Sequence, residues 1–269
     1  MIPKNKTNLT NPKLETPENL FWFYVPIVVS AALLTMIWLF RWNVNLFYSI
    51  NHVSGITGTH IWQVFTIFGD GLISALLIAF WIRKKPEIAW SFLLATLFYM
   101  IILNMLKDYF DFKRPPALLA PETFFLAGKA YMKRSFPSGH TTTIFAFCGV
   151  ISFYYKSLKI RLLTLTLALM VGLSRVLIGV HWPADILGGA ILGWSSAGIG
   201  IFMAKRSTWG YHKIVKYSLS LLLALAAGLL VFKYNTGYQD AEMVQKILGI
   251  IIIGYLGFTY FVRDRIKMI

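Results

Sequence analysis

The stretch KRSFPSGHTTTIFAFCGVISFYY (residues 133–155) joins a polar, cationic lip to an apolar run. Two cations, a proline, a serine, a glycine and His140 stand at the lip, and the apolar run covers residues 139–155. Its length approaches the roughly 20 residues that a helix needs to cross a bilayer. The stretch therefore predicts a reactive histidine at the point where a helix enters a membrane.

The composition supports a membrane environment for the whole chain. Of its 269 residues, 57% are hydrophobic, 16% are aromatic and only 14% are charged, and the mean hydropathy is +0.62. A soluble domain of this size needs a far more polar surface. The net charge of +15 comes from short basic clusters between apolar runs, without the basic helix face of a nucleic-acid-binding protein, so no nucleic-acid partner is expected. The single cysteine, Cys148, is expected to be a packing residue.

Apolar segments of about 16–22 residues recur along the chain and predict eight membrane spans. Because backbone polar groups in lipid must be satisfied within the segment, runs of this length are helices, and the predicted fold is an all-α, polytopic membrane helix bundle. Residues 1–20 are polar and are expected to form a cytoplasmic tail. The predicted spans cover 21–40, 61–82, 88–106, 139–155, 162–180, 184–204, 217–233 and 246–262.

The loop charges predict an orientation. If eight helices cross in turn, most basic clusters fall on one side, which the positive-inside rule makes cytoplasmic. The loop over residues 107–138 breaks the rule, because it carries six cations on the outer side, and binding of an anion is the natural reason. The predicted cytoplasmic cations are Lys4, Lys6, Lys13, Arg83, Lys84, Lys85, Lys156, Lys159, Arg161, Lys205, Arg206, Lys213, Lys216, Arg263, Arg265 and Lys267. The six outer cations are Lys107, Lys113, Arg114, Lys129, Lys133 and Arg134.

Three groups of polar residues, within 107–115, 137–140 and 174–185, are predicted to lie at this outer face. The first function that they suggest is phosphate binding. Ser138 suits a helix N-cap, and Gly139 lets another group approach the backbone closely. The first amides of such a helix attract phosphate through hydrogen bonds and the helix dipole. Arg114 and Arg175 can each bind phosphate oxygens with a forked geometry, and Lys107 adds a compact charge, so that no metal is needed to stabilise a phosphoryl group.

Two histidines, His140 and His181, remain for proton transfer and bond making. Asp185 follows His181 by four residues, and Pro183 between them suits the first turn of a helix. Asp185 can then reach back to the imidazole ring. A carboxylate that binds one ring nitrogen fixes the tautomer and leaves the other nitrogen free to attack, as in a catalytic triad, but with histidine as the nucleophile.

With these residues in view, the sequence resembles the type 2 phosphatidic acid phosphatase superfamily. The family signature is Lys, six residues, Arg-Pro; then Pro-Ser-Gly-His; then Ser-Arg, five residues, His, three residues, Asp. Every position matches, from Lys107 to Asp185. The resemblance implies His181 as the nucleophile that forms a phosphohistidine, His140 as the acid and Asp185 as the residue that orients His181. It implies phosphate binding by the group Lys107, Arg114, Ser138, Gly139 and Arg175.

The resemblance also implies a six-helix core and metal-independent hydrolysis without a cofactor. We therefore expect a transmembrane catalytic core over residues 21–204, which includes the active-site loop 107–138. A C-terminal extension over residues 205–269 would add two transmembrane helices of unassigned role.

Other polar and aromatic residues have simpler interpretations. His52, His60 and His212 are expected to be interfacial side chains, and Asp70, placed within a predicted span, is expected either to face the polar pocket or to pair with a cation. The loop cations outside the signature (Lys113, Lys129, Lys133 and Arg134) are expected to face solvent or lipid head groups. The expected interface anchors are Trp22, Trp42, Trp81 and Trp182, and the glycines expected to allow close helix packing are Gly188, Gly189 and Gly193.

The favoured function is a lipid phosphate or diphosphate phosphohydrolase at the outer, periplasmic or extracellular, face of a bacterial-type cytoplasmic membrane. Undecaprenyl diphosphate is the preferred substrate, with phosphatidylglycerol phosphate, phosphatidate and lipid A phosphate as competitors. A lipid phosphotransferase with the same pocket is an alternative, and an anionic lipid carrier is an alternative of another class. Membrane lipids are the other expected partners, and the sequence makes no prediction of oligomeric state.

Overall fold

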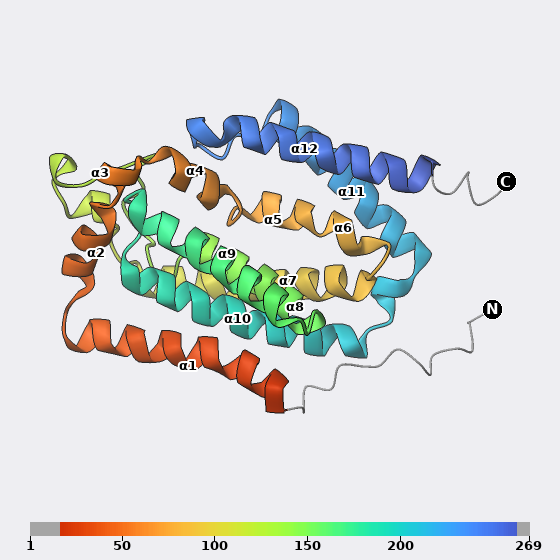
Figure 1. The fold of residues 1–269 in the computed structure, drawn as a ribbon, viewed down its shortest axis with the longest axis horizontal. Coiled ribbons are helices and arrows are strands. Elements are labelled where there is room, and N and C mark those ends of the chain that lie inside the picture. Colours follow the sequence, from red (N-terminus) through yellow and green to blue (C-terminus); the bar gives the residue numbers. More distant parts are fainter. Residues whose placement is uncertain (1–16, 263–269) are drawn as a thin grey trace.

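The computed structural model describes residues 17–262, and these residues form helices joined by turns, without strands. Figure 1 shows the longer helices running roughly side by side. Of the predicted N-terminal tail, only positions 17–20 are among the described residues. The predicted cytoplasmic cations outside the described residues are Lys4, Lys6, Lys13, Arg263, Arg265 and Lys267. The helices are α1 (Pro17–Leu39), α2 (Asn43–Asn51), α3 (Ser54–Thr57), α4 (His60–Ile67), α5 (Gly71–Leu77), α6 (Ala79–Ile82), α7 (Pro86–Phe110), η1 (Pro115–Ala117), η2 (Pro121–Thr123), α8 (Gly139–Tyr154), α9 (Leu158–Leu177), α10 (Pro183–Arg206), η3 (Trp209–Tyr211), α11 (Lys213–Phe232), η4 (Gln239–Ala241), α12 (Glu242–Gly257) and η5 (Phe258–Val262).

Helix α8 is the centre of the bundle. All of its residues from Thr141 to Phe153, including Cys148, are buried, and it packs against α7, α9 and α10. Helices α8 and α10 approach closely at Gly193, where a Cβ atom would lie only 2.3 Å from the Thr142 carbonyl oxygen. The absence of a side chain at this position permits the approach. The helix-packing role predicted for Gly189 and Gly193 is therefore confirmed, and it fixes the start of α10 beside the start of α8, whereas Gly188 lies against the ring of Phe136 in the loop before α8.

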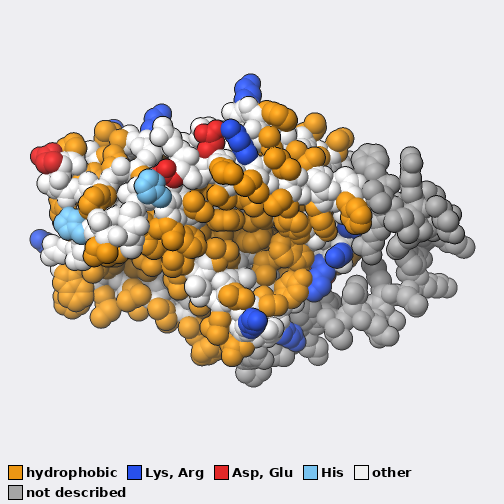
Figure 2. Space-filling model, turned by 45° about the horizontal axis from the view of Figure 1, so that its top comes forward, with side chains coloured by type: hydrophobic (Ala, Val, Ile, Leu, Met, Phe, Trp, Pro, Cys, Tyr) orange, Lys and Arg blue, Asp and Glu red, His pale blue; other side chains and the backbone are white. Residues whose placement is uncertain are grey.

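The eight predicted spans are all helical, but only six of the helices in the described part of the chain are long and apolar enough to cross a bilayer alone. The second predicted span is a bent pair, α4 followed by α5 and α6, with an angle of 62° at the break, and it reaches this length and hydropathy only when both parts are counted together. Helix α8 has 16 residues, which is short for a span. Exposed apolar side chains cover the face seen in Figure 2. The chain is a multi-pass membrane protein.

Asp70 stands at the break in the bent pair, and among the described residues its hydrogen-bond partners do not include the cation that was one of the two expectations. It is the N-cap of α5 and accepts hydrogen bonds from the backbone N–H groups of Leu72 and Ile73. Its second oxygen accepts a hydrogen bond of 2.7 Å from the hydroxyl of Tyr234. A carboxylate in an apolar bundle is costly unless it is hydrogen-bonded, and here backbone amides and a tyrosine, rather than a cation, supply the partners.

Two further expectations are corrected by packing. Trp182 is only 5% exposed and donates through Nε1 to the Lys113 carbonyl oxygen at 2.8 Å, so it anchors the loop to α10 and does not lie at the membrane interface. Arg161 was expected in a loop but lies in α9 and is 1% exposed. Its guanidinium lies 5.4 Å from the ring of Trp22, and the aliphatic stem and the aromatic ring bury each other.

The end of the bundle that carries the PSGH segment is held together by Asn51. Its buried side-chain amide donates to the carbonyl oxygens of Phe125, Val176 and Leu177 at 2.9–3.1 Å and accepts from the Phe125 N–H at 2.8 Å. Ser54 also donates to the Leu177 carbonyl, at 2.7 Å. One side chain thus joins α2, the long loop and the C-terminus of α9, whose last carbonyls have no partner within the helix.

Replacing Asn51 by leucine is expected to lower the free energy of unfolding by roughly 2–4 kcal/mol, because the backbone N–H and carbonyl of Phe125 lose their partner and each of the two α9 carbonyls loses one of its donors. Asn45→Leu is the matched control, since Asn45 lies in the same helix with an exposed side chain, and a change within about 0.5 kcal/mol is expected there. Unfolding in detergent micelles, followed by circular dichroism, measures both. Equal stability of the two variants would contradict the anchoring role.

Helices α11 and α12 form an antiparallel hairpin that packs on α5 and α6, and Figure 1 shows them along the edge of the bundle opposite α1. The loop between them, residues 233–238, lies at the same end of the bundle as the start of α10. The extension is therefore in position to contribute to the polar end of the molecule.

Candidate active site

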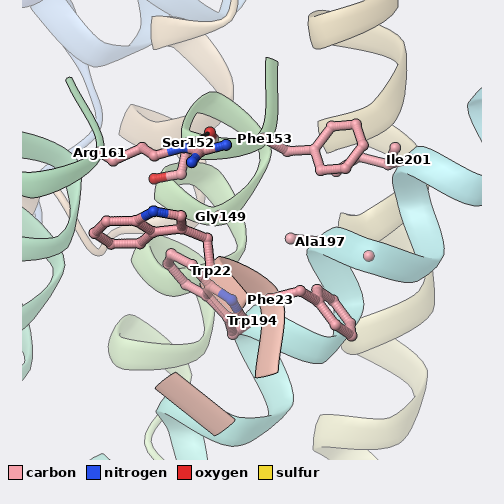
Figure 3. Close-up of a pocket in the computed structure, with 10 residues that line it drawn as sticks. Trp22, Phe23, Gly149, Ser152, Phe153, Arg161, Trp194, Ala197 and Ile201 are labelled. Atoms are coloured by element: carbon pink, nitrogen blue, oxygen red, sulfur yellow. Dashed lines mark hydrogen bonds between the residues drawn. The ribbon is translucent and has the colours of Figure 1, made fainter. Parts of the chain in front are cut away.

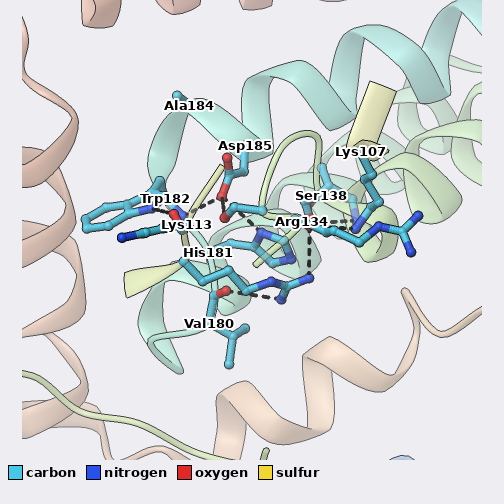
Figure 4. A network of polar contacts seen from close by, with 12 residues as sticks. Lys107, Lys113, Arg134, Ser138, Val180, His181, Trp182, Ala184 and Asp185 are labelled. Carbon is cyan, nitrogen blue, oxygen red and sulfur yellow. Dashed lines mark hydrogen bonds and ion pairs between the residues drawn. The ribbon is translucent and has the colours of Figure 1, made fainter. Parts of the chain in front are cut away.

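Four helix ends meet at the polar end of the bundle, and each carries residues that the sequence analysis selected. Lys107 is in the last turn of α7, Arg175 in the last turn of α9, His140 in the first turn of α8 and Asp185 in the first turn of α10. Figure 4 shows Lys107 of α7, Asp185 of α10 and Arg134 and Ser138 from the loop before α8 gathered around His181. The basic helix junctions α6–α7, α8–α9 and α10–α11 lie at the other end of the bundle.

His181 and Asp185 form the pair that their spacing predicts. Nδ1 of His181 lies 3.0 Å from Oδ2 of Asp185, and both side chains are almost fully buried. The pairing requires α10 to begin at Pro183, because Asp185 then lies in the first turn and its Oδ2 also accepts the Trp182 backbone N–H at 2.9 Å. With Nδ1 donating to the carboxylate, Nε2 is left with its lone pair free for attack on phosphorus.

A third donor to the same carboxylate oxygen is Ser135, which the sequence analysis missed. Its buried hydroxyl donates to Oδ2 of Asp185. Ser135 is held in turn by its backbone N–H, which donates to the Phe112 carbonyl oxygen at 2.9 Å. Ser135 thus supplies a hydrogen bond to Asp185 and helps to hold its carboxylate in place. The only sequence signal for this role was the position of Ser135 just before the PSGH segment.

Backbone carbonyl groups, most of them in the loop before α8, position Arg114 and Lys107. Arg114 is buried and donates from Nε to the Lys133 carbonyl at 3.0 Å, from Nη1 to that of Val180 at 3.3 Å and from Nη2 to that of Arg134 at 3.4 Å. Lys107 donates from Nζ to the same Arg134 carbonyl at 3.2 Å. Three of the five guanidinium protons and one of the three ammonium protons are thus used, which leaves donors for an anion.

The start of α8 supplies neutral donors. Ser138 is the N-cap, as predicted, and its Oγ accepts from the N–H and the hydroxyl of Thr141 at 3.4 and 3.0 Å. Its own hydroxyl proton is therefore available to another acceptor. The N–H groups of Gly139 and His140 precede the first intrahelical bond, so they have no helical partner and, with the helix dipole, favour an anion at this position.

Arg175 is held on the other side of the site. Its Nη1 donates to Oγ1 of Thr66 at 2.5 Å and to the hydroxyl of Tyr238 at 2.6 Å. Its Nε is buried and has no hydrogen-bond partner among residues 17–262. Neither Thr66 nor Tyr238 was selected from the sequence, because both are distant along the chain and belong to no motif.

The charges around His181 favour its neutral form. Burial lowers the pKa of His181 well below its ordinary value, and Arg114, Arg175, Lys107 and His140 lower it further. A neutral imidazole has the free lone pair that a nucleophile needs, and the same cations attract an anionic substrate.

The other three histidines and two of the loop cations have partners outside the predicted site or lie away from it. Arg134 pairs with Asp108 at 3.0 Å and Lys133 with Asp111 at 3.6 Å. His60 lies 2.7 Å from Asp240, and His52 lies 3.2 Å from the Thr123 carbonyl. His212 is at the N-cap of α11, near the other end of the bundle. None of these contacts includes a residue of the predicted site.

A recess on the bundle, shown in Figure 3, is separate from this site. Along α8 it begins nine residues after His140, about 14 Å away at the helical rise. Its charged residue, Arg161, donates through Nε to the Ser152 carbonyl at 3.3 Å, so this side chain has a structural role. The lining residues are Trp22, Phe23, Gly149, Ser152, Phe153, Arg161, Trp194, Ala197, Gly198 and Ile201.

The fold and the site together define a class: a membrane helix bundle with a carboxylate-oriented histidine inside a cage of cations at one end. Residues 88–209 match the PAP2 superfamily, and the chain belongs to this family. The match contains every predicted site residue and ends before α11 and α12.

Individual relatives agree with the family match. The chain is 28% identical over 160 residues to the lipid A 1-phosphatase of Rhizobium johnstonii, covering 55% of this chain and 64% of that protein, which is less than two thirds of its length. It is 30% identical over 169 residues to the undecaprenyl-diphosphatase of Sulfolobus acidocaldarius, covering 57% and 75%. The crystal structure of Aquifex aeolicus LpxE superposes with a TM-score of 0.53 and 28% identity, covering 60% of this chain and 94% of that one.

Proposed function

We propose that this protein is a lipid phosphate or diphosphate phosphohydrolase that works through a phosphohistidine on His181. The observation that carries the proposal is the His181–Asp185 pair inside a ring of three cations and a helix N-terminus. Such a ring suits a phosphoryl group, whose oxygens carry the negative charge in the transition state. The names of the relatives, an undecaprenyl-diphosphatase and a lipid A 1-phosphatase, support a lipid substrate.

The first step forms a bond from Nε2 of His181 to phosphorus and breaks the bond from phosphorus to the leaving oxygen. Asp185 keeps the proton on Nδ1 and stabilises the positive ring that forms. His140, protonated in this step, gives its proton to the leaving oxygen. Water then attacks phosphorus, His140 takes a proton from that water, and the nitrogen–phosphorus bond breaks to release orthophosphate.

The binding residues have assigned roles in the same proposal. Lys107, Arg114 and Arg175 hold the phosphate oxygens together with the Ser138 hydroxyl and the Gly139 amide. Because the cage lies at the end of the bundle, a lipid can place its head group there while its tails stay beside the apolar helix faces. We propose undecaprenyl diphosphate as the substrate and the outer face of a cytoplasmic membrane as the side. The catalytic core would cover residues 21–204, and residues 205–269 would form the extension.

Phosphate release by the purified protein in detergent tests this function. The panel contains undecaprenyl diphosphate, phosphatidylglycerol phosphate, phosphatidate and lipid A, each with and without a chelator. We expect orthophosphate from at least the first lipid at equal rates with and without chelator, because every group in the proposed steps belongs to the protein. Activity that chelator abolishes would overturn the mechanism, and a labelled phosphate that reappears on a second lipid instead of in water would reassign the protein as a transferase.

A further inference from the structure

The C-terminal hairpin places one of its side chains in the site. Tyr238 lies in the loop between α11 and α12, is 5% exposed and accepts a hydrogen bond of 2.6 Å from Nη1 of Arg175. Its ring centroid lies 5.7 Å from the Arg175 guanidinium carbon. The hairpin lies outside the residues that match the family, so this contact connects a part of the chain without an assigned role to a proposed phosphate ligand.

The contacts of Arg175 divide its guanidinium into two ends. Nη1 is fixed to the protein by Tyr238 and by Thr66, from α4. Nε is buried and donates to nothing in the part of the chain that the structure describes, although a buried donor without a partner is costly. Nε lies on the edge of the guanidinium that offers two parallel N–H groups to an oxyanion. A phosphate that accepts from this edge would satisfy Nε, while Nη1 keeps the group from turning.

Tyr238 is itself held firmly, which a positioning role requires. Tyr234, in the same loop, donates to Asp70 at 2.7 Å, and Asp240 accepts from Gln63 of α4 at 2.5 Å. Gln245 donates to the Leu230 and Tyr234 carbonyls and accepts the Thr236 N–H at 3.2 Å, which ties the two ends of the loop together.

The loop before α8 closes on the opposite side of the tyrosine. Gly128 has a φ of +82°, and a Cβ there would lie 2.6 Å from Cε1 of Tyr238. Only glycine combines this backbone conformation with this approach. The phenol ring is therefore enclosed between the active-site loop and the end of α9.

We propose that Tyr238 is a positioning residue for the phosphohydrolase, which orients Arg175 so that its Nε edge faces the substrate phosphate. The proposal rests on the proposed function for the identity of the anion. It gives the C-terminal hairpin a role: the hairpin completes the oxyanion cage from outside the part of the chain that matches the family.

The test compares Tyr238→Phe with Tyr255→Phe. Tyr255 is the matched control because it lies in the same hairpin and its hydroxyl also binds the core, at the Phe80 carbonyl oxygen at 3.1 Å, away from the site. Vanadate, an anion with the shape of the phosphoryl transition state, is the probe. Tyr238→Phe is expected to weaken vanadate inhibition and lower kcat/KM about tenfold, the effect of losing one hydrogen bond to a charged group, whereas Tyr255→Phe leaves both within about twofold of the wild type.

A second comparison separates positioning from general packing. In an Arg175→Ala background, Tyr238→Phe is expected to change vanadate inhibition and kcat/KM by less than about twofold, because the two residues act as one unit. Equal vanadate inhibition in Tyr238→Phe and Tyr255→Phe, or a full tenfold loss in the Arg175→Ala background, would overturn the positioning role.

The proposed function fails by a different readout. A wild type that releases no orthophosphate from any lipid of the panel rejects the phosphohydrolase, and the positioning role is then decided by vanadate-induced stabilisation against heat. Greater stabilisation of Tyr255→Phe than of Tyr238→Phe supports the role. Equal stabilisation, or none in the wild type, overturns it.

Discussion

Replacing His181 by glutamine is expected to lower kcat on a lipid phosphate by on the order of 10⁴-fold or more, the scale seen when a covalent hydrolase loses its nucleophile. Glutamine keeps a polar side chain beside Asp185 but has no nitrogen lone pair that can attack phosphorus. The second readout is the intermediate itself. Rapid mixing with a substrate labelled with ³²P, followed by alkaline quenching, should trap label on the wild-type protein and none on His181→Gln.

His52→Gln is the control, because His52 lies at the same end of the bundle and its ring contacts the Thr123 carbonyl and the rings of Tyr48 and Phe125, all outside the predicted site. Its kcat should stay within about twofold of the wild type. Label trapped on His181→Gln, or wild-type turnover by that variant, would assign the nucleophile to another group and reject the mechanism.

Replacing His140 by asparagine is expected to lower kcat by about 10²–10⁴-fold on a lipid monophosphate, the contribution of a general acid to proton transfer. The loss should depend on the leaving group. An alkoxide must be protonated as it leaves, whereas nitrophenolate is a stable anion and leaves without a proton. With nitrophenyl phosphate as the substrate, the burst of nitrophenolate that accompanies phosphohistidine formation should therefore slow by no more than about tenfold in the same variant. Steady-state kcat does not report this difference, because it also contains the second step, in which His140 acts as the base.

His212→Asn is the control for this pair of assays, because His212 lies at the N-cap of α11 and outside the site. Both substrates should react with His212→Asn as they do with the wild type. An equal loss in the rate of phosphohistidine formation from the two substrates in His140→Asn would show that His140 binds phosphate or supports the fold, and would remove the acid role from the mechanism.

Much of the fold could be predicted from local patterns. An apolar run of about 20 residues can satisfy its backbone in lipid only as a helix. Each of the eight runs that hydropathy selected is accordingly helical in the structure. Hydropathy could not predict the break at Asp70, because the residue is a single charge inside an otherwise apolar run. The partner that makes this charge tolerable, Tyr234, is 164 residues away in the chain. The same holds for Arg161, whose contact with the ring of Trp22 joins two residues that are far apart in the chain.

The candidate site divides in the same way. The residues that stand at fixed offsets were predictable: Asp185 reaches His181 because a helix begins at Pro183, and Ser138 caps α8 because it precedes the first apolar turn. Ser135, Thr66 and Tyr238 were missed. Serine, threonine and tyrosine are common in loops and at helix ends, so their residue types alone predict no contact with a site.

The sequence by itself determined the helices, the ends at which their polar residues lie and the set of ionisable groups available for phosphate chemistry. These properties depend on hydropathy and on the short-range geometry of helix ends, which a few neighbouring residues fix. Only the tertiary structure decided which neutral groups form hydrogen bonds with those ions. Arg114 donates to loop carbonyls, Asp185 accepts from the Ser135 hydroxyl, and Arg175 donates to the phenol of Tyr238 in the C-terminal hairpin. A hydrogen bond is short and directional, so its partners are set by how distant helices pack and not by the order of residues along the chain.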